Sequence, residues 1–526
     1  MKPAEGAADA IPLKRAPQPQ PLPLEPGGND RLVDALSGAA LRRAMAFVTL
    51  SWVFGSVWAT AIAGAPLTLF ANALHASKFE FGLLSALPFI ASLASMPASW
   101  WTERTGARKR MFLSGLYTQR LLWFPIALLP TWIALRGGGN ARAMGWAMGV
   151  FLVLVFLMHV AGNVGGPGWL SWMADVVPER LRGKYFSRRR QWGILTAIPA
   201  ALFAGWFLDS LTASASAGAT RDGLVLKWCA ILFMCAAIFG LVDIAMFHFV
   251  PEIRKAPQPS VPLLAVLKQP LKDREFLWFG GFIATLTFAV SFMGQFVTLY
   301  CIERVGVTNT GTQLMLLVAP MLAQLIVLPV WGHAADRMGK KPVLIIGALG
   351  LVPVGLGWCL MTSGTIWLGY LLSALGAAFW TAVEVANLNL VLEFTGSDDN
   401  GERGGNGKGR SGGGSGYVAM NSVIINVAGC LGGLTSGVIA QSLAHWQYDT
   451  GIALIPQLTF YEILFAISAV LRLLAVVIFL PHIHEHGAAG TREALRFMSA
   501  NIYNNLFNAI LQPIRFLRIR SFRQED

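Results

Sequence analysis

Twelve apolar runs, each long enough to cross a lipid bilayer, dominate the sequence. They occupy about 44–70, 81–100, 111–135, 144–173, 187–213, 225–250, 276–300, 310–333, 342–362, 365–392, 417–443 and 458–481. A membrane-spanning helix needs about 20 mostly apolar residues, and inside lipid its backbone groups must be hydrogen-bonded within the segment. We therefore predict an all-α membrane protein with twelve transmembrane helices.

The composition excludes an ordinary soluble protein. Hydrophobic residues make up 55% of the 526 residues and charged residues only 13%, whereas soluble domains carry about 25% charged residues. The cysteines lie inside apolar runs, without the spacing of a metal site, and we interpret them as packing residues. They are Cys229, Cys235, Cys301, Cys359 and Cys430.

The basic residues predict the orientation of the chain. If the N-terminus lies inside the cell, 33 of the 41 Lys and Arg residues fall in cytoplasmic segments and 6 in external loops. Such a bias sets membrane orientation, so both termini should be cytoplasmic. The net charge of +13 then reflects topology and contact with anionic lipid, and does not indicate nucleic acid as a partner.

The sequence contains an internal repeat. The string TERTGARKR after the second run matches ADRMGKK after the eighth, and a Gly/Tyr pair opens both the fifth and the eleventh run. The interval from Glu103 to Tyr185 is 82 residues, and that from Asp336 to Tyr417 is 81. Two parallel repeats of six spans are typical of transporters whose two bundles rock about a central site.

These features predict five segments and one long loop. The expected segments are a disordered cytoplasmic tail (1–40), an N-terminal six-helix bundle (41–250), a cytoplasmic linker (251–275), a C-terminal six-helix bundle (276–482) and a basic amphipathic cytoplasmic tail (483–526). The last tail fits a helix on the inner leaflet and equally a helix that caps the bundle. The Gly-rich loop at 396–416 is too polar to pack and should be flexible.

Two motifs resemble the major facilitator superfamily. The string running from Gly332 to Lys341 (GHAADRMGKK), with its partner after the second run, is similar to that family's signature loop. The string DVVPERLRG, from Asp175 to Gly183, resembles the loop between its spans 4 and 5, notably in sugar porters. The resemblance implies two six-helix bundles, alternating access and a monomer. Together with the lack of a recognisable eukaryotic sorting signal, it implies a bacterial inner membrane.

The resemblance also implies a latch at the cytoplasmic face. A carboxylate at a helix end, followed by a Gly turn and basic residues, can pair with charges nearby, and such pairs must break when the face opens. The candidate latch residues are Glu103, Arg104, Gly106, Asp175, Arg182, Asp336, Arg337 and Gly339. Ordinary positive-inside charge is the alternative. Glu103 replaces the family's usual Asp and Glu393 aligns with Asp175 without the Pro and Arg, so we expect an asymmetric latch.

Polar side chains at membrane depth are costly and predict a substrate cavity. In the family, spans 1, 4, 7 and 10 line that cavity. The candidates on these spans and on span 11 are Trp52, Trp58, His159, Asn163, Gln295, Trp380, Glu384, Asn387, Asn421 and Asn426. Glu384 is the candidate for proton coupling, with a structural, hydrogen-bonded carboxylate as the alternative. A structural role is favoured for His159.

Four further charged residues fall on supporting spans. Arg120, Asp243, Glu462 and Arg472 are interpreted as structural pairs or as side chains that reach the membrane surface.

The sequence therefore predicts a secondary active transporter of a small organic solute that works by alternating access and is driven by a gradient such as that of protons. The aromatic lining and the DVVPERLRG likeness favour sugars or similar polar solutes. Export of amphipathic or drug-like compounds is an alternative, as is a non-transporting sensor or assembly factor. No nucleotide-binding, zinc-hydrolase or nucleophile motif is present, so we expect neither an enzyme nor a cofactor.

Overall fold

A computed structural model describes residues 38–136, 140–178, 181–213, 221–252, 267–268, 270–396, 413–452 and 455–483. The predicted tails, most of the linker and residues 397–412 of the Gly-rich loop lie outside these ranges. The described chain is almost entirely helical, as predicted, with one short β-hairpin. A helix already begins at Gly413, so the end of the predicted flexible loop is helical, which corrects that expectation.

The N-terminal bundle consists of nine helices and one short 3₁₀ turn among the described residues. They are α2 (Gly38–Ile62), α3 (Ala65–Ala73), α4 (Lys78–Ser92), α5 (Ser95–Thr105), α6 (Arg108–Leu121), α7 (Trp123–Leu135), α8 (Ala141–Val176), α9 (Arg182–Ala213), α10 (Arg221–Met246) and η2 (Phe247–Phe249).

The C-terminal bundle is more interrupted. Its elements are η3 (Pro270–Lys272), α12 (Arg274–Ser291), α13 (Gly294–Leu299), η4 (Tyr300–Val305), α14 (Asn309–Gln313), η5 (Leu314–Val318), α15 (Ala319–Met338), α16 (Lys340–Gly357), η6 (Trp358–Leu360), α17 (Ile366–Gly396), α18 (Gly413–Ser442), β1 (Tyr448–Ile452), β2 (Ile455–Leu458), α19 (Phe460–Phe479) and η7 (Leu480–His482).

Prolines explain several of the breaks within spans. Eleven described helical segments are long and apolar enough to cross a membrane, and the remaining predicted span, 111–135, is divided into α6 and α7 at Leu122. A proline cannot donate to the carbonyl four residues earlier and crowds it. Pro125, Pro97 and Pro66 each follow such a break by a few residues.

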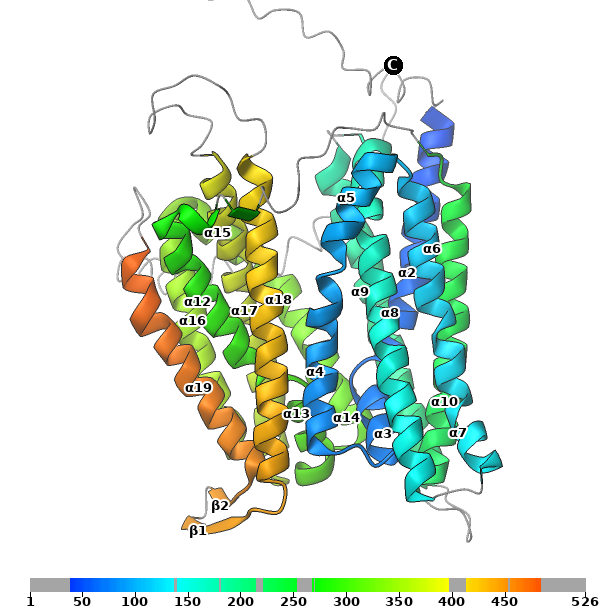
Figure 1. Cartoon of the computed structure of the whole chain (residues 1–526), viewed down its shortest axis with the longest axis vertical. Coiled ribbons are helices and arrows are strands. Elements are labelled where there is room, and N and C mark those ends of the chain that lie inside the picture. Colours follow the sequence, from blue (N-terminus) through cyan, green and yellow to red (C-terminus); the bar gives the residue numbers. More distant parts are fainter. Residues whose placement is uncertain are drawn as a thin grey trace, which may run out of the picture.

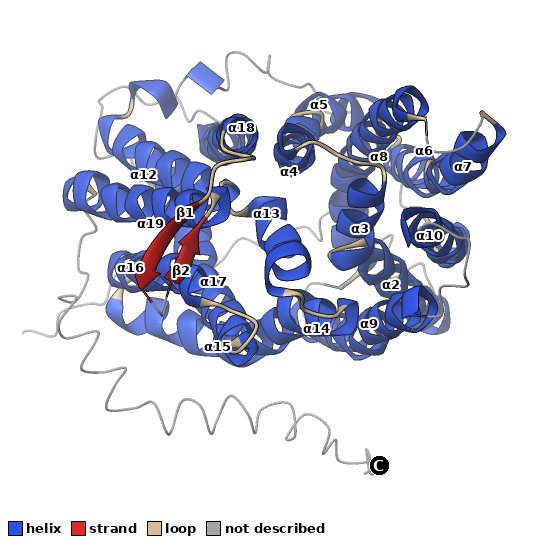
Figure 2. Ribbon diagram, turned by 90° about the horizontal axis from the view of Figure 1, so that it is seen from below, coloured by secondary structure: helices blue, strands red, loops and turns tan. Residues whose placement is uncertain are grey.

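The two bundles lie side by side and meet at one end only (Figure 1). We call the end that carries the basic segments 104–110, 182–190 and 337–341 the basic end, and the end that carries β1 and β2 the hairpin end. The helices are close together at the hairpin end and apart at the basic end. Viewed from the hairpin end, α3 and α13 lie near the middle, and α14 lies at the edge between α15 and α9 (Figure 2).

The buried core has the same asymmetry. One cluster of buried side chains joins both bundles, with Phe70 and Phe233 from the first and Phe296 and Tyr300 from the second. The other two clusters each belong to a single bundle. One surrounds Phe282 in the C-terminal bundle, and the other lies at the basic end of the N-terminal bundle. The apolar core therefore bridges the bundles toward the hairpin end and is divided elsewhere.

The sequence repeat is visible in equivalent contacts. Tyr185, at the start of α9, donates through its hydroxyl to the carbonyl of Met45 on α2 at 3.0 Å. Tyr417, at the start of α18, donates to the carboxylate of Asp273 just before α12 at 3.2 Å. In each bundle the tyrosine that opens the fifth span thus fixes the beginning of the first.

Candidate functional site

Backbone packing of α4 against α18 forms the main contact between the bundles. Gly82 faces Gly437 and Gly433 so closely that a Cβ on Gly82 would lie 2.3 Å from the Cα of Gly437. The amide of Phe79 also donates to the Gln441 side chain at 3.3 Å. Small residues permit this approach, and the spacing of four between Gly429, Gly433 and Gly437 is a signal that sequence reading could have used.

Asp209 of α9 connects the bundles at the hairpin end. Its carboxylate accepts from the backbone amides of Asn309 and Thr310 at 2.8 and 2.9 Å, and from the Thr310 hydroxyl at 2.6 Å. These amides belong to the first turn of α14 and have no partner within the helix. A carboxylate at a helix N-terminus is favoured electrostatically, so Asp209 is a specific tether.

Gln313 of α14 inserts into the break between α2 and α3. Its side chain is fully buried, donates to the carbonyl of Ala63 at 3.2 Å and accepts from the amide of Ala65 at 3.3 Å. The break frees these backbone groups, which lipid cannot satisfy. Packing of α14 against this break therefore completes the hydrogen bonding of the broken helix.

A further polar contact joins the two bundles at the hairpin end. Lys78, at the start of α4, pairs with Glu303 of η4 at 2.8 Å, and the hydroxyl of Tyr461 donates to the same carboxylate at 2.7 Å. Cross-bundle polar contacts of the described residues thus gather toward the hairpin end.

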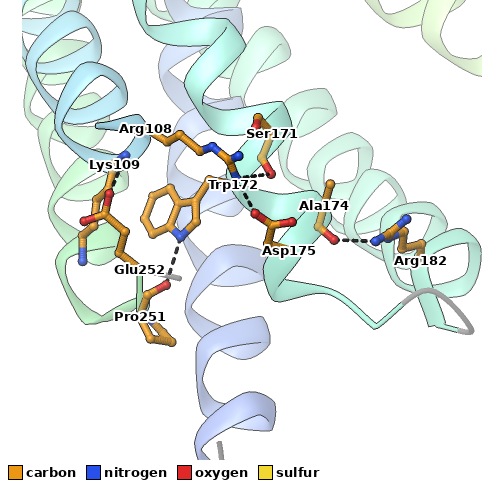
Figure 3. A network of polar contacts seen from close by, with 9 residues as sticks. All are labelled: Arg108, Lys109, Ser171, Trp172, Ala174, Asp175, Arg182, Pro251 and Glu252. Atoms are coloured by element: carbon orange, nitrogen blue, oxygen red, sulfur yellow. Dashed lines mark hydrogen bonds and ion pairs between the residues drawn. The ribbon is translucent and has the colours of Figure 1, made fainter. Parts of the chain in front are cut away.

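At the basic end, the N-terminal latch candidates contact their own bundle (Figure 3). Arg108 of α6 forms an ion pair with Asp175 of α8, and their side chains are 12% and 9% exposed. Arg182 donates back to the α8 carbonyl of Ala174 and, through Nε, to Val177 at 3.2 Å. The same region joins α6 to the segment that follows η2, because the amide of Lys109 donates to Glu252 at 3.3 Å.

The C-terminal bundle repeats this pairing at its own surface. Lys340, after the Gly339 turn, pairs with Glu393 of α17 at 2.6 Å. This pair is more exposed than that of Arg108 and Asp175, at 29% and 47%. Sequence reading missed Arg108 and Lys340 as partners, although both follow the Gly of a recognised motif loop.

The other latch candidates lie at helix ends on the basic side. Gly106 ends α5 with a φ of 66°, and Gly339 ends α15 with a φ of 92°. Glu103 and Asp336 are exposed. Arg104 lies over the ring of Trp100 at 5.2 Å, and Arg337 is exposed beside Asp336. The structure therefore places the candidate latch residues of the two repeats on separate bundles.

A cavity of about 470 Å³ lies between α4 and the C-terminal bundle. Two predicted cavity residues line it, Gln295 of α13 and Trp380 of α17. Glu384 follows Trp380 by one turn, is exposed and accepts from the Trp380 indole at 2.8 Å. Asn387 lies another turn on, and its Oδ1 is buried without a hydrogen-bond partner among the described residues.

Backbone irregularity helps to form this cavity. The span from α12 to α13 breaks at residues 292–293, and Gly294 has a φ of 20°. The amide of Gln295 donates across the bundle interface to Ser85 at 2.9 Å, and its side chain accepts from Thr68 at 3.2 Å. Non-helical backbone is tolerated at membrane depth where protein or a cavity covers it.

The predicted N-terminal cavity residues lie outside this cavity. His159 and Asn163 share a face of α8, where the Asn163 amide donates to the His159 carbonyl at 2.9 Å and accepts from Ser92 at 3.3 Å. Trp52 lies against Arg189 of α9, whose guanidinium carbon is 4.5 Å from the ring centroid.

The two predicted cavity residues on α18 lie in the C-terminal bundle. Asn421 is buried with an unpartnered Oδ1 among the described residues, and Asn426 is half-buried.

The supporting charged residues are buried. Arg120 pairs with Asp243 at 3.1 Å, and its guanidinium carbon lies 3.3 Å from the ring centroid of Trp58, which explains the burial of that predicted cavity residue. Glu462 forms a capping box with Thr459 at the start of α19. Arg472 differs, because it lines the cavity and has no carboxylate within 4 Å in the described part of the chain.

Comparison with solved structures identifies related folds. A point mutant of the nucleoside transporter NupG matches with a TM-score of 0.60 and 13% identity, over 85% of this chain and 100% of that one. A D-xylose–proton symporter matches at 0.55 and 16%, over 86% and 98%. A bacterial homologue of the human lysosomal transporter Spinster, inward-facing and unoccupied, matches at 0.56 and 14%, over 88% and 98%.

Sequence comparison identifies the family. No curated protein matches the chain. The family profile of the Major Facilitator Superfamily matches residues 36–406, which is more than half of the chain and includes both motif loops. Together with eleven described segments fit to cross a membrane, this match shows that the chain is a multi-pass membrane protein and belongs to the Major Facilitator Superfamily of transporters.

Proposed function

We propose that this protein is a secondary active transporter that carries a small organic solute by alternating access, and that the structure is its inward-open state. The main support for the proposal is the way the buried core is divided between the bundles. One apolar cluster joins the bundles toward the hairpin end, while separate clusters serve each bundle elsewhere. Packed cores have discrete arrangements and do not deform continuously, so a second state would break the hairpin-end contacts and join the basic ends.

In this proposal the basic end faces the cytoplasm of a bacterial cell. The excess of Lys and Arg at that end supports the orientation, which also places both termini inside. The latch residues would then be separated in the inward-open state and would help to hold the basic end closed in the outward-open state. Ordinary positive-inside charge remains the competing explanation for these residues.

The substrate would be polar and small, with sugars or similar solutes favoured. Gln295, Ser373 and the indoles of Trp358 and Trp380 are among the residues that line the 470 Å³ cavity. Cavities of this size, with a few polar groups in a mainly apolar wall, suit small ligands. The solved neighbours include a nucleoside transporter and a D-xylose symporter. Export of an amphipathic compound is the alternative, which the large apolar share of the lining favours.

Glu384 is our candidate for proton coupling. It is the acidic residue on the α17 face that carries Trp380, and it is exposed in this state. Rocking of the bundles would bury this face of α17 and change the free-energy cost of ionising the Glu384 carboxyl group. A structural carboxylate held by the Trp380 indole is the alternative reading.

Thermal unfolding of the purified protein against sugars, nucleosides, amino acids and hydrophobic cations tests the proposal first. A ligand at 100 times its Kd stabilises the folded state by about 2.7 kcal/mol. Uptake of any stabilising polar solute into proteoliposomes would support transport. Stabilisation by hydrophobic compounds alone would favour export. Binding without flux in either direction would favour a sensor or assembly factor.

A further inference from the structure

Arg472 places a positive charge beside the central cavity. It lies in the middle of α19, only 4% of its surface is exposed, and its side chain contributes to the cavity wall. Ionised side chains this deep in a membrane protein normally have a charged partner or face a functional pathway. The partners of Arg472 therefore determine what the cavity can bind.

The groups that contact the Arg472 guanidinium are neutral. One Nη donates to the carbonyl of Leu351 at 2.7 Å, and the other contacts the sulfur of Met293 at 3.0 Å. A thioether is a weak acceptor. Within the described ranges, Nε has no hydrogen-bond partner and no Asp or Glu lies within 4 Å of the guanidinium.

Arg120 shows how this protein compensates a buried arginine. It is 5% exposed, similar to Arg472, but it pairs with Asp243 at 3.1 Å and lies over the Trp58 ring. Arg472 lacks an equivalent anion among the described residues, although its burial is the same. A group from outside the protein can supply it.

The wall of the cavity provides further polar groups for such an anion. The Ser373 hydroxyl on α17 is buried without a hydrogen-bond partner among the described residues and lines the same cavity. Gln295 lines it as well, and the side chains of Leu84, Phe89 and Trp358 supply apolar surface. A cation, a free hydroxyl and an amide in a mainly apolar cavity match the pattern of an oriented ligand site.

We infer that this cavity binds an organic anion, whose carboxylate or phosphate group pairs with Arg472 and accepts from Ser373 while its remainder packs against the apolar wall. The inference deepens the proposed transport function by assigning the charge class of its substrate. Arginine suits carboxylate and phosphate groups because its donors form a planar fork. The anion enters as a solute and is not a lipid headgroup.

The test uses the full-length protein in nanodiscs of phosphatidylcholine and matched pairs of probes. The pairs are gluconate with glucose, nicotinate with nicotinamide, and glycerol 3-phosphate with glycerol. We expect at least one anion to raise the unfolding temperature, while its neutral partner does not. Arg472→Gln should weaken that anion's binding by a hundredfold or more, and Ser373→Ala by about tenfold, as expected for hydrogen bonds to a charged group.

Arg304→Gln is the matched control, because Arg304 is an exposed arginine near the hairpin end, and it should bind as the wild type does. If Arg472→Gln does not fold, Arg472→Lys and Ser373→Ala carry the test, with Arg472→Lys expected to retain charge but lose at least tenfold in affinity. Equal stabilisation by neutral and anionic partners, or undiminished anion binding in these variants, would overturn the inference. Stabilisation only by nanodiscs that contain phosphatidylglycerol would overturn it too.

Flux measurements separate this inference from the transport proposal. If proteoliposomes take up a solute but no anion binds in an Arg472-dependent way, the anion site is wrong and transport stands. If the anion binds in an Arg472-dependent way but never crosses the membrane, the site stands and transport is wrong.

Discussion

Gly82 of α4 and Gly437 of α18 lie backbone against backbone at the interface between the bundles, with only 2.3 Å between a Cβ built on Gly82 and the Cα of Gly437. Neither helix can accept a side chain here without moving apart. In the proposed transport cycle this contact would form only while the hairpin end is closed, so a substitution here would change the balance between the two states.

Gly82→Val should open the hairpin end and disfavour the inward-open state. Overpacking a tight contact costs about 1–3 kcal/mol, enough to shift a two-state equilibrium by about 5-fold to 150-fold. Transport should fall, and cysteines placed at the basic end should react more slowly with a hydrophilic maleimide. Gly145→Val is the control, because a Cβ at Gly145 meets no atom within 4 Å. Unchanged labelling in Gly82→Val would contradict the role of this contact.

Asp209→Asn should weaken the tether to α14. The variant removes the charge that accepts from Asn309 and Thr310, and such bonds contribute about 1.5–3 kcal/mol. The inward-open fraction should fall by about tenfold, which inter-bundle fluorescence transfer can measure. Asp222→Asn removes an exposed carboxylate that contacts His75 within one bundle and should change nothing. An equal effect of both variants would argue against a specific tether.

Asp175→Asn tests the N-terminal latch. It leaves Arg108 without an ionic partner in a largely buried site, so we expect a loss of about 1–3 kcal/mol in stability together with altered transport kinetics. Glu393→Gln breaks the more exposed pair with Lys340 and should cost less than about 1 kcal/mol. Unchanged transport kinetics in Asp175→Asn would remove the latch interpretation.

Glu384→Gln should uncouple transport from the proton gradient. The amide cannot release a proton, so uptake should no longer respond to an imposed pH difference, while exchange of labelled for unlabelled substrate should persist. Asp449→Asn, an exposed change in β1, should keep the wild-type response. A Glu384→Gln variant that still depends on the gradient would leave this carboxylate with a structural role.

The sequence predicted the membrane class, the two-bundle fold and the repeat, because lipid imposes long apolar segments that periodicity and length reveal. The division of the third predicted span at Leu122 was less visible, since apolar residues continue on both sides of Leu122. Pro125 marked it, but a proline inside a membrane helix does not always break it.

The site was harder to predict than the fold. Gln295 and Trp380 line the cavity, whereas Trp58 is covered by Arg120. Arg472 was interpreted as a structural residue because a single sequence does not show whether a carboxylate lies opposite. Contacts such as those of Asp209 and Gln313 join residues about 100 and 250 positions apart, and only the tertiary structure brings them together.

Distance measurements between spin labels test alternating access most directly. In a cysteine-free background, one pair would be placed at the basic end, at Thr105 and Val418, and another at the hairpin end, at Asp222 and Asp449; all four are exposed. In nanodiscs we predict two distance populations at each end, with Gly82→Val shortening the basic-end distance and lengthening the hairpin-end distance together. A single distance at both ends that Gly82→Val leaves unchanged would contradict the account.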